Sequence, residues 1–111
     1  MNNFGGVANY TKPTHTTVSV GSTSTAVLVK NQKRKYVVLQ NISVEAISLK
    51  VGATAVLGAG IIIPADSTGG ATPTGDGGTY EFSPAFGNLS WGAINAISTS
   101  GSTNLLVTEC E

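Results

Sequence analysis

The side chains that could carry out chemistry are few and far apart in the chain. Its 111 residues include one histidine, His15, one cysteine, Cys110, and six Asp or Glu residues. A hydrolase triad, an acid/base pair or a metal centre needs several such groups brought together. No second histidine and no Gly-x-Ser-x-Gly sequence accompanies His15. We therefore expect no catalytic residue, no cofactor and no metal, and predict that the protein is not an enzyme.

Three further features resemble ligand sites only superficially. The segment 52–60 is rich in glycine, but no Lys-Ser/Thr pair follows it as in a phosphate-binding loop. Asp66, Asp76 and Glu81 lack the spacing of a calcium-binding loop. Cys110 has no partner for an intrachain disulfide, so we expect a small buried thiol.

One basic cluster stands out, the segment 30–35, between two apolar runs. This placement predicts a hairpin connection whose solvated cations discourage strands from pairing edge to edge. The alternative is a docking point for an acidic surface, with Lys33, Arg34 and Lys35 as the contacts. The formal net charge of 0 gives no positive field for a nucleic acid, and no apolar run is long enough for a membrane span. We expect neither partner.

Charged residues make up 11% of the chain, whereas about a quarter is usual for soluble domains. Small polar residues take their place, and these lose little side-chain entropy when another protein covers them. This composition favours a subunit of a homo-oligomer. The alternative is a β-rich monomer whose exposed faces are rich in Ser and Thr.

Alternating apolar residues predict short strands throughout the chain. Half-buried strands are expected at 16–20, 46–51, 79–83 and 104–109, and a further strand at 91–98. Three runs that are apolar on both faces predict central or doubly covered strands at 26–29, 36–39 and 61–63. With about eight strands and no helical periodicity, we predict an all-β fold: a single antiparallel β-sandwich or jelly-roll-like barrel.

Two segments interrupt this rhythm. Residues 1–15 are expected to form an extended N-terminal arm ahead of a sandwich domain at 16–111, with Phe4, Val7 and Tyr10 as anchors on a neighbour. Terminal disorder is the alternative for this arm. The Gly/Thr-rich segment 66–78 predicts a mobile surface loop, which is either a contact with a partner or a tolerated insertion.

The order of five segments supports a resemblance. A basic residue opens an apolar strand ending in Gln-Asn-x-Ser (34–43), and then come a strand leading to Gly (47–52), an apolar strand at 60–64, an aromatic strand at 80–82 and a last strand at 105–109. In this order the chain resembles small structural proteins of tailed bacteriophage virions. The most distinctive portion is 40–43, where Asn and Ser side chains are expected to stabilise a turn rather than to bind a ligand.

The resemblance implies a virion structural protein: a capsid decoration or cement subunit, typically a homotrimer, that binds the major capsid protein and stabilises the phage head. Because the first residues lack the pattern of a secretory signal, we expect synthesis in the host cytoplasm followed by incorporation at the capsid surface. The alternative is a ligand- or glycan-binding module of a head fibre or tail tip. Such a module would use the 66–78 loop and aromatic platforms such as Tyr80 or Trp91, although core positions explain these residues equally well.

Overall fold

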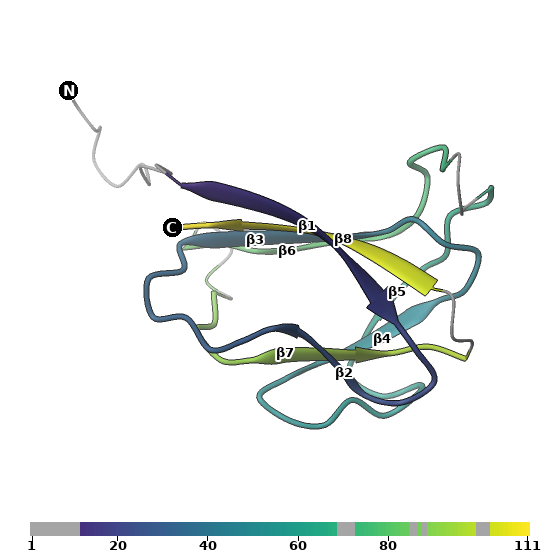
Figure 1. Cartoon of the computed structure of the whole chain (residues 1–111), viewed down its shortest axis with the longest axis horizontal. Coiled ribbons are helices and arrows are strands. Elements are labelled where there is room, and N and C mark those ends of the chain that lie inside the picture. Colours follow the sequence, from purple (N-terminus) through teal and green to yellow (C-terminus); the bar gives the residue numbers. More distant parts are fainter. Residues whose placement is uncertain (1–11, 69–72, 85–86, 88, 100–102) are drawn as a thin grey trace.

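The computed structural model describes residues 12–68, 73–84, 87, 89–99 and 103–111, and within them the chain forms eight strands and no helix (Figure 1). The strands are β1 (Pro13–Val20), β2 (Thr25–Leu28), β3 (Tyr36–Asn41), β4 (Ile47–Val51), β5 (Ile61–Ile63), β6 (Thr79–Phe82), β7 (Ile94–Ile97) and β8 (Thr103–Cys110).

Two four-stranded antiparallel sheets make up the sandwich. Sheet A has the order β1-β8-β3-β6, and sheet B has the order β2-β7-β4-β5. The predicted all-β fold is therefore confirmed, with two open sheets, each of which has two edge strands.

The core lies between the sheets and follows the predicted alternation. In β3 and β8, for example, Val37, Leu39, Leu105 and Val107 are buried, and the residues between them on each strand face outward. Burying such a side chain contributes about 1.5–3 kcal/mol. The remaining buried apolar side chains of this cluster are Val20, Val27, Ile47, Leu49, Ile63, Phe82, Ile94 and Ala96.

β1 begins earlier than the sequence pattern indicates. The strand starts at Pro13 rather than at Thr16, and His15 pairs with Thr108 of β8. His15 thus belongs to the sheet and not to an arm. The rest of the predicted arm, residues 1–11 with Phe4, Val7 and Tyr10, lies outside the described residues.

The three runs that are apolar on both faces divide into one central strand and two edge strands. β3 is central as predicted, but β2 and β5 lie at the two edges of sheet B. The prediction was wrong for these two, because apolar residues of both runs face solvent: Ile62 of β5 is 53% exposed, and Val29, the residue after β2, is 72% exposed. Conversely, Ser48 lies between the inward-facing Ile47 and Leu49 of a strand predicted to be half-buried, yet it is buried as well, and its hydroxyl accepts a hydrogen bond from Gly58 N of the 52–60 segment.

The turn after β3 is built around a buried amide. The Asn41 side chain is 0% exposed and donates to the carbonyl oxygens of Glu45 (2.7 Å) and Ile63 (3.2 Å). Its Oδ1 accepts from both the backbone N–H (2.9 Å) and the hydroxyl (2.8 Å) of Ser43. Gly77 packs so closely here that a Cβ would lie 2.0 Å from the Asn41 carbonyl oxygen. The predicted turn-stabilising role of the Gln-Asn-x-Ser segment is confirmed.

Asn41→Ala should lower the free energy of unfolding by about 2 kcal/mol, because buried donors and acceptors lose their partner. Gln40→Ala is the matched control. Its partly exposed amide makes a 3.3 Å bond to Gly75 O, and its loss should cost no more than about 0.5 kcal/mol. Urea unfolding followed by circular dichroism measures both. Equal midpoints for the two variants would contradict this role of Asn41.

Candidate binding surface at the basic end of the sandwich

One end of the sandwich collects almost all of the cations. β1 starts there, β8 ends there, and both the β2–β3 connection and the segment between β6 and β7 cross it (Figure 1, left). The exposed lysines of this end are Lys12, Lys30, Lys33 and Lys35. The 30–35 segment is not the hairpin that we predicted, because it passes from β2 in sheet B to β3 in sheet A.

Arg34 lies inside the molecule, with 1% of its surface exposed. Its Nε donates to Glu109 Oε2 at 2.7 Å and its Nη2 to Val29 O at 2.7 Å. Its Nη1 donates to the carbonyl oxygens of Ser90 and Gly92, both at 2.9 Å. The expectation that the cations of the 30–35 segment are solvated is therefore wrong for Arg34, whose guanidinium connects three segments of this chain.

The connection around Arg34 is tied to the C-terminal strand. Asn31 Nδ2 donates to Glu111 Oε2 at 2.9 Å and to Glu109 Oε2 at 3.3 Å, and Asn31 Oδ1 accepts from Lys33 N at 3.0 Å. Because these bonds hold the backbone, Lys33 and Lys35 project from a fixed frame. The structure leaves both side chains exposed, and they remain candidate contacts.

Beside these lysines lies an exposed tryptophan. Trp91 is 54% exposed, although core burial had been an equally good expectation. Its carbonyl oxygen accepts from Asn31 N at 2.9 Å. The hollow around it has a volume of about 620 Å³ and is lined by Lys12, Gln32, Lys33, Arg34, Lys35, Pro84, Leu89, Trp91 and Glu111. We call this hollow the Trp91 surface.

The Trp91 surface combines a flat apolar ring with ammonium groups. Tryptophan is enriched among the residues that dominate protein interfaces, because one rigid ring buries much area. Lysines at the rim favour a partner with carboxylates and speed its approach. Sequence analysis did not find Lys12, Pro84 or Leu89, since only the fold brings these distant residues next to Trp91.

At the opposite end of the sandwich, Asp66 is the first residue of the 66–78 loop and is hydrogen-bonded to other residues of that loop. Its buried carboxylate accepts from the backbone N–H groups of Thr68 (2.9 Å), Thr74 (3.2 Å) and Gly75 (2.8 Å), and from the Thr74 hydroxyl (3.1 Å). Asp76 likewise accepts from Ser67 N and Oγ. The described flanks of this loop are thus held together, whereas we had expected a mobile loop.

These bonds change the acidity of the two aspartates. Burial favours the neutral form of Asp66, but the donors of Thr68, Thr74 and Gly75 outweigh it and hold the pKa of this carboxyl well below its ordinary value. The hydroxyl and N–H of Ser67 lower the pKa of Asp76 in the same direction. Since N–H and O–H donors already occupy the Asp66 oxygens, this carboxylate is poorly suited to a cation.

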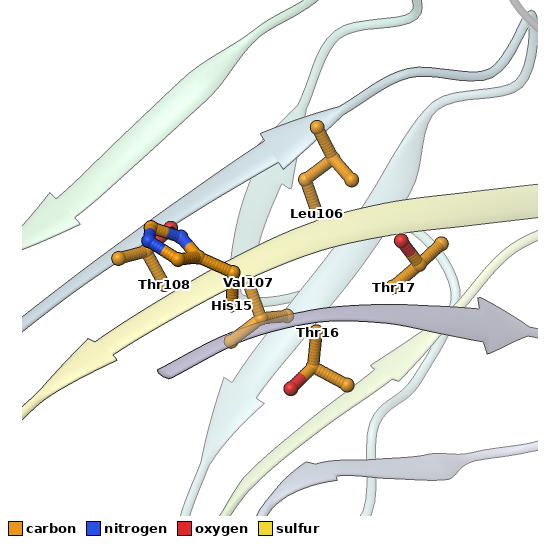
Figure 2. A pocket seen from close by; sticks show the side chains of 6 residues that line it. All are labelled: His15, Thr16, Thr17, Leu106, Val107 and Thr108. Atoms are coloured by element: carbon orange, nitrogen blue, oxygen red, sulfur yellow. The ribbon is translucent and has the colours of Figure 1, made fainter. Parts of the chain in front are cut away.

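The remaining reactive groups do not assemble into a centre. His15 Nδ1 and Thr108 Oγ1 are 2.9 Å apart beside a depression of about 160 Å³, which is also lined by Thr16, Thr17, Leu106 and Val107 (Figure 2). Cys110 is a buried free thiol as predicted, and burial together with the Glu109 charge raises its pKa. Among the described residues no group of three or more His, Cys, Asp or Glu side chains could hold a metal.

Comparisons with known proteins found no matching family model, no similar curated protein and no similar solved structure. In the described part of the chain, no helix is long and apolar enough to cross a membrane.

Arg34→Ala should lower the free energy of unfolding by about 3–5 kcal/mol, because Glu109 and three carbonyl groups lose a buried partner. Lys33→Ala, one residue away and exposed, should change it by about 0.5 kcal/mol or less. Chemical denaturation of both variants makes the comparison. If the two variants unfold alike, Arg34 does not link the sheets.

The hydrogen bonds to the Asp66 carboxylate predict that the stability of the fold depends on pH. Because folding lowers the pKa of Asp66, its stabilisation is fully present at neutral pH and is lost as the pH falls below about 4. Asp66→Asn should therefore be less stable than the wild type at pH 7, and the gap should narrow towards pH 3. Urea midpoints at pH 7, 5 and 3 test this. If the difference in urea midpoint between the wild type and Asp66→Asn stays constant over this range, the charge of the carboxylate does not contribute to stability.

Proposed function

We propose that this protein is a non-enzymatic structural subunit that binds a larger protein assembly through the Trp91 surface. The observation that carries the proposal is Trp91 itself, a large apolar ring held 54% exposed on a hydrogen-bonded frame. A folded chain gains stability by burying such a ring. The exposure of Trp91 in the free chain is explained by a partner that buries the ring on binding.

The frame makes the Trp91 surface suitable for binding. Arg34 fixes the carbonyl groups on both sides of Trp91, and Asn31 fixes the carbonyl of Trp91. A surface that is ordered before binding loses little conformational entropy when the partner arrives. The partner that fits this surface is a protein patch with an apolar centre and a carboxylate rim.

We propose that the larger assembly is a phage capsid and that the partner is its major capsid protein. The resemblance to small virion proteins supports this assignment, and so does the low charge of the chain, which suits a protein whose surfaces are covered by copies of itself and by the shell. The work of such a subunit is mechanical: each buried contact adds free energy to the shell. In this proposal Phe4, Val7 and Tyr10 supply a second contact.

A second candidate is a glycan-binding module of a head fibre or tail tip. The exposure of Trp91 next to Gln32 and lysine side chains favours it, because aromatic faces stack on sugar rings and polar groups bind hydroxyls. This candidate uses the same surface, so one variant tests both candidates, and what the wild type binds separates them.

Trp91→Ala should weaken co-sedimentation with phage capsids that lack this protein by at least about tenfold, as expected for the central residue of an interface. Leu57→Ala is the matched control, since Leu57 is 51% exposed in the 52–60 segment, away from the Trp91 surface. It should co-sediment as the wild type does.

Two outcomes would contradict the capsid proposal. If Trp91→Ala co-sediments with capsids as the wild type does, the Trp91 surface is not the contact. No co-sedimentation of the wild type, together with signals on a glycan array that Trp91→Ala loses, would establish the glycan-binding module instead.

A further inference from the structure

We propose that β1 forms an antiparallel pair with β1 of a second copy, so that sheet A continues across a two-fold axis into the partner. The inference deepens the proposed function and rests on its self-association part. It is carried by the backbone of β1, by the contrast with the other three sheet edges, and by the charges at the two ends of the sandwich.

β1 is an edge strand of eight residues in sheet A. The Lys12 carbonyl oxygen accepts from Glu111 N at 3.3 Å, so the backbone of Lys12 faces β8. Because backbone groups in an antiparallel strand alternate in direction, Thr14, Thr16 and Val18 also face β8. His15, Thr17 and Ser19 therefore direct their N–H and C=O groups away from the sheet, where no described strand pairs with them.

Pro13 agrees with this assignment. Proline has no N–H and is tolerated in a sheet where that position faces an open edge. By the same alternation Pro13 faces outward, opposite Cys110 of β8. In the described part of the chain this edge is also accessible, since Pro13 to Thr17 and Ser19 are all exposed. Figure 2 shows His15 and Thr17 on β1 next to Thr108 and Leu106 of β8.

The other three edges carry features that discourage pairing. β5 has three residues and is followed by Pro64. β2 has four residues and an irregularity between Ala26 and Leu28. β6 also has four residues. One of them is the charged Glu81, and Pro84 follows soon after the strand. β1 is longer than these and carries no Lys, Arg, Asp or Glu.

A second copy of β1 is a suitable partner because the strand complements itself. In an antiparallel pair, outward N–H groups of one copy meet outward C=O groups of the other, and the reverse holds across the two-fold axis. The side chains brought together are mainly Thr, Ser and His, and Thr–Thr and Thr–Ser pairs stabilise neighbouring strands.

Charge at the two ends supports the antiparallel orientation. Lys12 precedes β1 at the basic end, whereas Glu45, Asp66 and Asp76 lie at the other end, where β1 finishes. The Glu45 carboxylate is bonded to Thr99, and Ser98 N donates to Gly21 O just after β1. Antiparallel pairing brings the basic end of each copy next to the acidic end of its partner. Parallel pairing would place like charges together.

The first experiment follows wild-type protein over a range of concentrations. Native mass measurement should show a dimer. Amide exchange monitored by NMR should show the N–H groups of His15, Thr17 and Ser19 gaining protection as the dimer forms, while Thr16 and Val18, already bonded to β8, are protected throughout. A monomer at millimolar concentration would overturn the inference. A closed trimer would overturn it as well, because a two-fold pair of identical strands ends at two copies.

The second experiment uses a matched pair of variants. Thr17→Pro removes an outward N–H of β1 without removing a bond to β8, and it should raise the dimer Kd at least tenfold. Thr79→Pro makes the same change on β6, the other edge of sheet A, where the alternation set by the bond from Asn41 N to Gly78 O points Thr79 outward. It should leave the Kd within about twofold.

Thr17→Lys provides a second test if proline disturbs the strand, since it adds a cation to the paired strand of each copy and should weaken the dimer most at low salt. Melting curves check that each variant is folded. If folded Thr17→Pro and Thr17→Lys both dimerise as the wild type does, β1 is not the interface. A wild-type dimer that does not co-sediment with capsids would instead contradict the proposed function and leave this inference standing.

Discussion

The buried guanidinium of Arg34 is the constraint on which the basic end of the molecule depends. One side chain binds Glu109 of β8 in sheet A, the chain leaving β2 through Val29, and the chain entering β7 through Ser90 and Gly92. It therefore joins the two sheets at a place where carbonyl groups need hydrogen-bond donors, which an apolar side chain does not have. The planar, forked guanidinium is suited to this because its donors reach several acceptors at fixed angles.

The two ends of the sandwich follow the same physical rule with opposite charges. At the basic end a buried cation collects carbonyl and carboxylate oxygens, and at the other end the carboxylate of Asp66 and the amide of Asn41 collect N–H groups and carbonyls of irregular segments. Irregular backbone can be buried only when its polar groups find partners. The chain satisfies this requirement with a few buried polar side chains, which leaves its flexible lysines at the surface.

The strands could be predicted from sequence because their signal is local. Ile47 and Leu49, or Leu105 and Val107, lie two positions apart on one strand, and this spacing alone places them on one face. Arg34 and Trp91 were placed wrongly or left open because their environments are made by segments far away in the chain. A cation among lysines gives no local sign that Glu109 and the carbonyls around Trp91 will enclose it. Edge and central strands were confused for the same reason, since pairing order is a property of the whole sheet.

The proposed contacts form one geometry. In an antiparallel pair of β1 strands, the two basic ends point in opposite directions, so each dimer presents two Trp91 surfaces at its far ends. A subunit of this kind bridges two separate sites on a shell instead of occupying one, and two linked contacts hold far more tightly than either contact alone. Rigidity matters in such a bridge. Once one Trp91 surface is bound, a fixed distance between the two surfaces raises the effective concentration of the second one only where two sites on the shell are separated by that distance. The buried hydrogen bonds of Arg34 supply this rigidity at the surface itself, and continuous sheet pairing would supply it between the copies.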